Sequence, residues 1–114
     1  MLIKNITKKR IISDNASLLK SDFQKFMGLM FTARQKKILI FKFKKEQHVP
    51  LHMFFVFYPI DVLFLDKNKI IVDAKEKFKP FAVYNSKKKA LYTIELPSGT
   101  IKKTKTRIGD KIKF

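Results

Sequence analysis

The stretch Ile60 to Ala74, I-D-V-L-F-L-D-K-N-K-I-I-V-D-A, contains the clearest structural signal in the chain. An apolar run from Ile60 to Leu65 and a second from Ile70 to Ala74 flank the polar residues 66–69, D-K-N-K. Turn-forming residues between two short runs rich in Ile and Val are typical of a β-hairpin. We therefore predict two antiparallel strands here and a mostly β fold around them.

Strand patterns continue on both sides of this hairpin. Leu39, Phe41 and Phe43 alternate with Ile40, Lys42 and Lys44, the period of two that marks a half-buried strand. Because proline cannot donate within a sheet, the apolar window Met53 to Leu65 is expected to hold one strand before Pro59 and another after it. Further strands are predicted at Arg10–Ile12, Ala16–Leu19, Ala90–Leu96 and Lys111–Phe114, the first two forming a hairpin around residues 13–15.

Helical signals are short. Ser21 as N-cap, Gln24 three residues later and Gly28 at the end favour a helix over Ser21–Met27. A second short helix or turn is expected within Thr100–Thr106. The predicted fold class is mostly β (α+β): one small domain spanning residues 1–114, with an antiparallel β-barrel-like sheet and one or two short helices.

The composition excludes several classes of protein. With 114 residues, 46% of them hydrophobic, the chain is too apolar for a disordered polycation and fits one modest core. It has no Cys, hence no disulfide, Cys zinc site or thiol nucleophile, which suits the cytoplasm. No secretion signal is visible, and the apolar window Met53 to Leu65 is too short to span a bilayer. We expect a cytoplasmic protein without membrane contact.

The formal charge of +17 is concentrated at the two ends of the chain. Residues 1–38 carry 9 basic and 2 acidic side chains, residues 39–76 carry 6 and 5, and residues 77–114 carry 11 and 2. If the two ends lie close together, as chain termini often do, they would merge into one positive face.

Basic clusters are the strongest partner signal. The candidate nucleic-acid-binding residues are Lys8, Lys9 and Arg10, then Lys87, Lys88 and Lys89, then Lys102, Lys103, Lys105 and Arg107. Such groups neutralise phosphates without reading sequence, and the nearby Phe78, Phe81 and Tyr84 could stack on bases. The alternative is a solvated surface of a Lys-rich chain, because specific phosphate and base readers are usually Arg.

Four motifs together carry a family resemblance. They are F-M-G-L-M-F at 26–31, H-M-F-F-V-F-Y-P-I-D-V-L-F-L-D at 52–66, I-E-L-P-S-G-T at 94–100 and G-D-K-I at 109–112. In this order and spacing the chain resembles, over about residues 16–114, the family called domain of unknown function 192. The resemblance implies a compact, mostly β domain with a barrel-like sheet and short helices, and it supplies no activity.

Candidate chemistry centres on His52 and Asp61. A hairpin around Pro59 could set them on adjacent strands, with the carboxylate orienting the imidazole as in general acid–base catalysis. The alternative is that Asp61 satisfies backbone groups. His48 and His52 lie four residues apart, but Pro50 interrupts a helix between them, and we expect neither a metal ion nor a cofactor. Glu95, between Ile94 and Leu96, is expected to point away from them, toward solvent or a Lys.

Three functions remain open from sequence. The first is a non-catalytic ligand- or partner-binding module with a pocket lined by Met30, His52, Met53, Phe54 and Asp61. The second is electrostatic, sequence-nonspecific binding of RNA or DNA through the basic ends. The third is an enzyme using His52 and Asp61.

Overall fold

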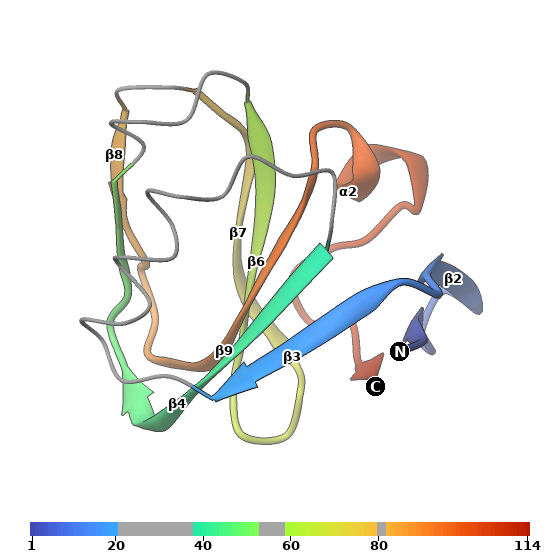
Figure 1. The fold of residues 1–114 in the computed structure, drawn as a ribbon, viewed down its shortest axis with the longest axis horizontal. Coiled ribbons are helices and arrows are strands. Elements are labelled where there is room, and N and C mark those ends of the chain that lie inside the picture. The colour runs from blue at the N-terminus through green and yellow to red at the C-terminus, as the bar shows by residue number, and fades with distance from the viewer. Residues whose placement is uncertain (21–37, 53–58, 80–81) are drawn as a thin grey trace.

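The computed structural model describes residues 1–20, 38–52, 59–79 and 82–114 (Figure 1). Its elements are β1 (Ile3–Asn5), β2 (Arg10–Ser13), β3 (Ala16–Lys20), β4 (Ile38–Gln47), β5 (Pro50–His52), β6 (Ile60–Leu65), β7 (Ile71–Phe78), β8 (Val83–Asn85), β9 (Ala90–Pro97), α2 (Thr100–Lys103) and β10 (Ile112–Lys113). The predicted strand before Pro59 and the predicted helix Ser21–Met27 lie outside the described residues.

A five-stranded sheet in the order β3-β4-β9-β6-β7 forms the centre of the fold. The predicted hairpin is confirmed, because β6 and β7 pair antiparallel with Leu63 opposite Ala74. Its turn is held by the Asp66 carboxylate, which accepts hydrogen bonds from the backbone N–H groups of Asn68 (2.8 Å) and Ile70 (3.0 Å). The strand predicted at Ala90–Leu96 is also confirmed as β9, which pairs antiparallel with both β4 and β6.

The predicted hairpin around residues 13–15 is wrong, although both of its strands exist. Strand β2 pairs with β1, whereas β3 runs parallel to β4 at the edge of the central sheet. The sheet is therefore not wholly antiparallel. Beside β4, Ala16 and Leu19 contact the two apolar clusters of the central sheet, a burial that pairing with the exposed strand β2 would not provide.

Both faces of the central sheet are buried. One face carries the first cluster, which includes Phe41, Val62 and Phe64, and the opposite face carries the second, which includes Ile40, Leu63 and Ile94. The expectation that β4 is half-buried is therefore wrong for its first half, because Ile40 is as fully buried as Phe41. Alternating side chains of β4 and β6 enter opposite clusters, so these strands resemble those of a sheet covered on both sides.

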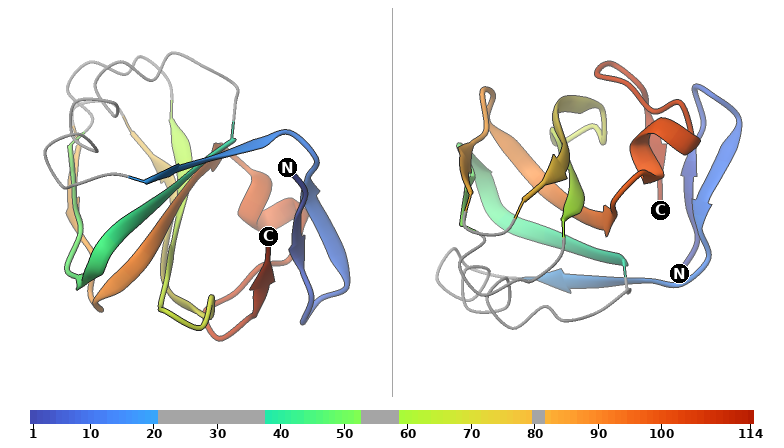
Figure 2. Two further views of the ribbon diagram at one scale, coloured as in Figure 1. Left: turned by 60° about the horizontal axis from the view of Figure 1, so that its bottom comes forward. Right: turned by 90° about the horizontal axis from the view of Figure 1, so that it is seen from above.

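Two small sheets cover these faces. The pair β5-β8 packs over the first cluster, and the three-stranded sheet β10-β1-β2 with α2 covers the second (Figure 2). The mostly β class with a short helix is confirmed. The sheets formed by the described residues are not closed into a barrel, because β3 and β7 remain separate edges of the central sheet.

Candidate functional site

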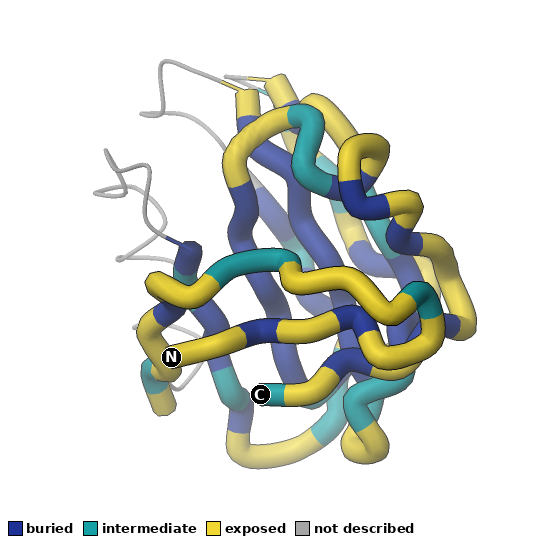
Figure 3. Tube along the Cα trace, turned by 90° about the vertical axis from the view of Figure 1, so that its right-hand side faces the viewer, coloured by how far each residue is buried: buried dark blue, intermediate teal, exposed yellow. Residues whose placement is uncertain are grey.

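The two ends of the chain meet in one layer. Strand β1 pairs antiparallel with β10, placing Lys4 opposite Lys113 and Asn5 opposite Ile112. The expected proximity of the basic ends is therefore confirmed, and Figure 3 shows the terminal strands side by side over the buried strands behind them. Like charges directly opposite each other destabilise a sheet, so the pair Lys4 and Lys113 favours a bound counter-anion.

A buried polar network locks this layer. The Asn5 side-chain amide donates to Thr106 Oγ1 (3.1 Å) and to Asp110 Oδ2 (2.9 Å). The Lys8 ammonium forms an ion pair with Asp110 at 2.8 Å, and the backbone N–H of Arg107 donates to the same carboxylate. Burial raises the pKa of Asp110, but hydrogen bonds from Asn5 and Lys8 outweigh it and leave the pKa lowered. Lys8 is thus occupied within the protein.

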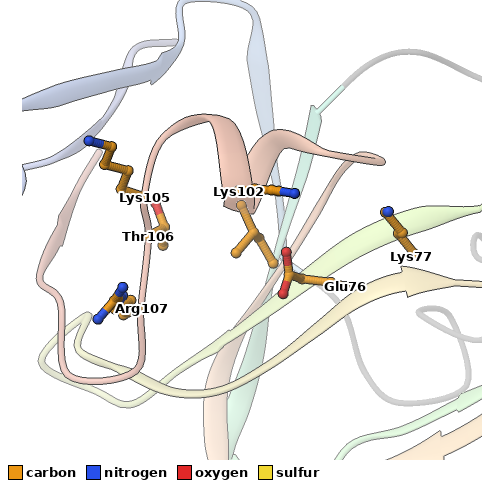
Figure 4. Close-up of a pocket in the computed structure, with 7 residues that line it drawn as sticks. Glu76, Lys77, Lys102, Lys105, Thr106 and Arg107 are labelled. Carbon is orange, nitrogen blue, oxygen red and sulfur yellow. The ribbon is translucent and has the colours of Figure 1, made fainter.

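A groove of about 550 Å³ lies between the α2 segment and β7. We call it the basic groove, and its lining residues are Glu76, Lys77, Ile101, Lys102, Lys105, Thr106 and Arg107. Figure 4 shows Glu76 and Lys77 across from Lys105 and Arg107, with Lys102 between them. Four cations and one carboxylate give the groove a net charge of +3.

Asp61 joins the two walls of the basic groove. Its Oδ1 accepts a hydrogen bond from the Lys77 backbone N–H (2.9 Å), and its Oδ2 accepts one from the Ile101 backbone N–H (2.9 Å). Asp61 itself is fully buried. The carboxylate therefore satisfies backbone groups, which was the alternative to a catalytic role for Asp61. It also fixes β7 relative to α2.

His52 and Asp61 do not lie on adjacent strands. His52 pairs with Val83 in the β5-β8 sheet, whereas β6, which carries Asp61, pairs with β7 and β9. That part of the catalytic hypothesis is wrong, because His52 and Asp61 belong to two different sheets. Met30, Met53 and Phe54, the other predicted pocket residues, lie outside the described residues.

A second hollow, of about 280 Å³, adjoins the first. We call it the N-terminal hollow, and it is lined by Lys4, Asn5, Ile6, Lys9, Arg10 and Ile11. Asn5 lines this hollow, Thr106 lines the basic groove, and their side chains are hydrogen-bonded. The two hollows are therefore neighbours, and together they gather seven cations.

The backbone at these hollows is strained. Among the described residues four lysines have positive φ, and three of them, Lys9 (54°), Lys77 (49°) and Lys105 (56°), line the two hollows. A side chain in this left-handed region costs roughly 1–2 kcal/mol, so glycine is the usual choice there. Strain of this kind clusters at functional sites. It was not detectable from the sequence, which also gave no reason to single out Lys4, Glu76 or Lys77.

The basic cluster Lys87–Lys89 lies away from both hollows. Residues 87–89 precede β9 and α2 follows it, so an eight-residue strand separates Lys87, Lys88 and Lys89 from the basic groove. Of the aromatic residues expected to stack on bases, Phe78 is buried in the first cluster and is not available for stacking. Tyr84 donates a hydrogen bond to Asp73 (2.7 Å), and Phe81 lies outside the described residues.

Histidine and carboxylate positions bear on metal binding. The Nδ1 atom of His48 lies 3.0 Å from the Ser86 carbonyl oxygen. Within the part of the chain that the structure describes, no group of three or more His, Asp or Glu side chains is placed to hold a metal ion. Over the same residues, no helix is both long enough and apolar enough to cross a membrane.

The exposure of Glu95 differs from the one predicted from sequence. It does point away from Ile94 and Leu96, but it is only 5% exposed and lies on the first-cluster face between Leu39 and Val62 of the neighbouring strands. Burial raises the pKa of Glu95 to about 7. The expectation of solvent was wrong because this face of the sheet carries the first apolar cluster, which the alternation in β9 could not indicate.

The fold is thus a mostly β domain with one short helix, in which the first and the last strand of the described residues pair. The chain belongs to the family of domain of unknown function 192, described as an uncharacterized ACR, whose model matches residues 3–114. The match begins earlier than the resemblance at residue 16 implied, so β1 and β2 are also part of the family domain.

Relatives and solved structures agree with this membership. The chain is 37% identical over 114 residues to a UPF0127 protein of Thermococcus sibiricus (98% of this chain, 73% of the relative), and 33% identical to one of Pyrococcus horikoshii (99% and 98%). It is similar in structure to a protein from Sinorhizobium meliloti described as a candidate transcription regulator (TM-score 0.79, 24% identity, 98% of this chain and 89% of that one). A protein of unknown function from Novosphingobium aromaticivorans gives a TM-score of 0.74 at 17% identity, over 87% and 74%. These two likenesses show the fold alone.

Proposed function

We propose that the protein is a non-catalytic module that binds the phosphate backbone of RNA or DNA, without sequence preference, through the basic groove and the N-terminal hollow. The observation that carries the proposal is the gathering of seven cations at two adjoining hollows. Three of these cations, Lys9, Lys77 and Lys105, have positive φ, a kind of strain that clusters at functional sites.

The cations at the two hollows are presented for contact. Lys102, Lys105 and Arg107 are exposed side chains, and Lys4 extends from the outer face of β1. By contrast, Lys8 is held by Asp110, so its contribution is to anchor the layer. Asp61 keeps the groove open by tying its walls together, which makes it a positioning residue for this surface.

The chemistry of the surface favours phosphate contact over base reading. The two hollows contain two Arg among their seven cations, and the remaining five are Lys, which act as point charges. Phe78 is buried and does not serve as a stacking platform. Binding of this kind is electrostatic and salt-dependent, because each neutralised phosphate releases counterions. A cytoplasmic location forms part of the proposal.

Salt dependence gives the size of the expected effect. If all seven cations contact phosphates, affinity falls as roughly the fifth to sixth power of salt concentration. A fourfold rise in salt then weakens binding by about a thousandfold for single strands and several thousandfold for duplex DNA. Fewer contacts give a proportionally shallower slope, so the slope counts the participating groups.

The test compares two triple variants of equal charge. The groove variant removes three exposed cations from the basic groove by the changes Lys102→Gln, Lys105→Gln and Arg107→Gln. The control variant removes three exposed cations from the opposite end of β9 by changing Lys87, Lys88 and Lys89 to Gln. Both proteins carry a net charge three lower than the parent chain. Binding to short labelled single-stranded RNA and duplex DNA is measured at several salt concentrations, with circular dichroism confirming the fold.

The groove variant is expected to lose most of its affinity and to show a salt slope smaller by about 2–3, since each lost phosphate contact lowers the slope by about 0.7–0.9. The control is expected to bind nearly as the parent does. Equal losses in the two variants would mean that net charge alone drives binding, and no binding by the parent chain at moderate salt would refute the function.

A further inference from the structure

Two buried polar groups near the middle of the fold have no hydrogen-bond partner. They are the hydroxyl of Thr93 and the Oε1 atom of Glu95, and among the described residues they are the only buried side-chain polar atoms of this kind. Thr93 is fully buried and Glu95 is 5% exposed. Buried polar groups are almost always paired, so each exception requires an explanation.

The two groups share one strand and one face. Positions 93 and 95 of β9 are two apart, which places their side chains on the same side of the sheet about 7 Å from each other. Thr93 lies between Phe41 and Phe64 of the neighbouring strands, and Glu95 lies between Leu39 and Val62. Thr93 and Glu95 are thus two polar side chains surrounded by apolar side chains of the first cluster.

Glu95 and its neighbours on the adjacent strands form a row across the sheet. Among the described side chains of this row, no cation neutralises the charge of the Glu95 carboxylate. Along the row that contains Glu95, the next charged side chain is Lys75, opposite Val62 on β7. Its ammonium lies 5.4 Å from the centre of the Tyr84 ring. Desolvation is the cause of the raised pKa of Glu95, which agrees with a carboxyl that no charge stabilises.

We propose that Thr93 and Glu95 form the polar part of a binding site for a small molecule that carries a primary ammonium head on a short apolar body. An ammonium group has three donors, so one head can serve both the carboxylate and the hydroxyl. The apolar body would contact the side chains that flank them, such as Leu39 and Val62. Ligand sites commonly combine an apolar lining with a few placed polar groups.

A cation gains more here than a neutral ligand does. A buried charge is stabilised chiefly by an opposite charge in hydrogen-bond contact, whereas a neutral donor supplies an ordinary hydrogen bond. The overall positive charge of the protein repels cations at long range, but salt screens this repulsion beyond about 8 Å. The ion pair between the Glu95 carboxylate and the ammonium head therefore determines that the site prefers a cationic ligand.

Three probes of equal length separate the alternatives. Butylammonium, n-butanol and butyrate have the same apolar body and differ in the charge of the head. Each is titrated into the full isotopically labelled chain while backbone amide shifts are recorded by NMR. The variants are Glu95→Gln, which removes the charge, Thr93→Val, which removes the hydroxyl, and Asp14→Asn, which removes an exposed carboxylate as the control.

The expected result is saturable binding of butylammonium, with shifts centred on residues 93 and 95 and on the facing positions 39 and 62. Glu95→Gln is expected to weaken it about tenfold or more, Thr93→Val by a smaller factor, and Asp14→Asn not at all. Equal binding of n-butanol, stronger binding of butyrate, or shifts unchanged in Glu95→Gln would overturn the proposal. No saturable shift with any probe would also overturn it and would leave buried water as the partner of the pair. The result is independent of nucleic-acid binding, which uses the layer on the other face of the central sheet.

Discussion

Replacing Glu95 by Gln is expected to stabilise the protein above about pH 4.5, with the gain growing as pH rises and complete above about pH 7. The carboxyl has a pKa of about 7 in the folded protein against an ordinary value of 4.5, because burial disfavours its charged form. Between these values the folded state binds a proton that the unfolded state has lost, so the free energy of unfolding falls as pH rises. Below about pH 4.5 both states are protonated and the cost disappears.

The difference of 2.5 between the two values, 7 minus 4.5, gives the magnitude. At 1.36 kcal/mol per pKa unit, ionising Glu95 costs about 3 kcal/mol well above pH 7. Glu95→Gln removes this cost, so the variant should gain up to about 3 kcal/mol at pH 9, or roughly 12 °C in Tm for a chain of this length. At pH 4 the two proteins should differ little.

Urea denaturation followed by circular dichroism at pH 4, 6, 7.5 and 9 measures this difference directly. Asp14→Asn, the loss of an exposed carboxylate, is the control and should show a small difference at every pH. A Glu95→Gln variant that is less stable than the parent at pH 9, or a difference that does not change with pH, would refute the reasoning. Either result would mean that Glu95 has a compensating partner.

Three further substitutions test the basic groove and the layer in which β1 pairs with β10. Asp61→Asn should cost about 2–4 kcal/mol in urea denaturation, because one of the buried N–H groups of Lys77 and Ile101 loses its acceptor; a loss below about 0.5 kcal/mol would show that the groove walls do not depend on it. Asp110→Asn should destabilise by about 1–3 kcal/mol at pH 7, and since the pKa of Asp110 is lowered, this deficit should shrink as pH falls below the ordinary range of an Asp; a deficit that does not shrink at all as the solution is acidified would contradict it. Lys105→Gly should relieve the positive φ and raise stability by up to about 1 kcal/mol while weakening RNA binding, and a variant that binds as tightly as the parent would remove Lys105 from the interface.

Local patterns predicted the strands well, because each is recorded in adjacent residues. The turn chemistry of residues 66–69 between two apolar runs specifies the β6-β7 hairpin, and the Asp66 carboxylate holds it as that chemistry requires. The same reasoning failed at residues 13–15. There the turn signal was equally good, but the partner of β3 was decided by the apolar burial available beside β4.

The candidate site was predictable only in part. The charge at the two ends pointed to a joined basic layer, and the pairing of β1 with β10 confirmed it. The groove itself depends on Lys77 of β7, which no basic cluster contains, and on Asp61, whose carboxylate reaches two backbone groups 16 and 40 residues away. Contacts over such distances leave no local pattern.

By itself, the sequence determined the strand content, the family and the concentration of positive charge at the ends of the chain. Periodicity, turn residues and composition act within a few residues of one another, so they can be read without the fold. Only the tertiary structure decided that Lys8 is occupied by Asp110, that Lys87–Lys89 lie away from the groove, and that the Oε1 atom of Glu95 is buried with no hydrogen-bond partner among the described residues. Each of these depends on which surfaces come together, and that is a property of the packed sheets as a whole.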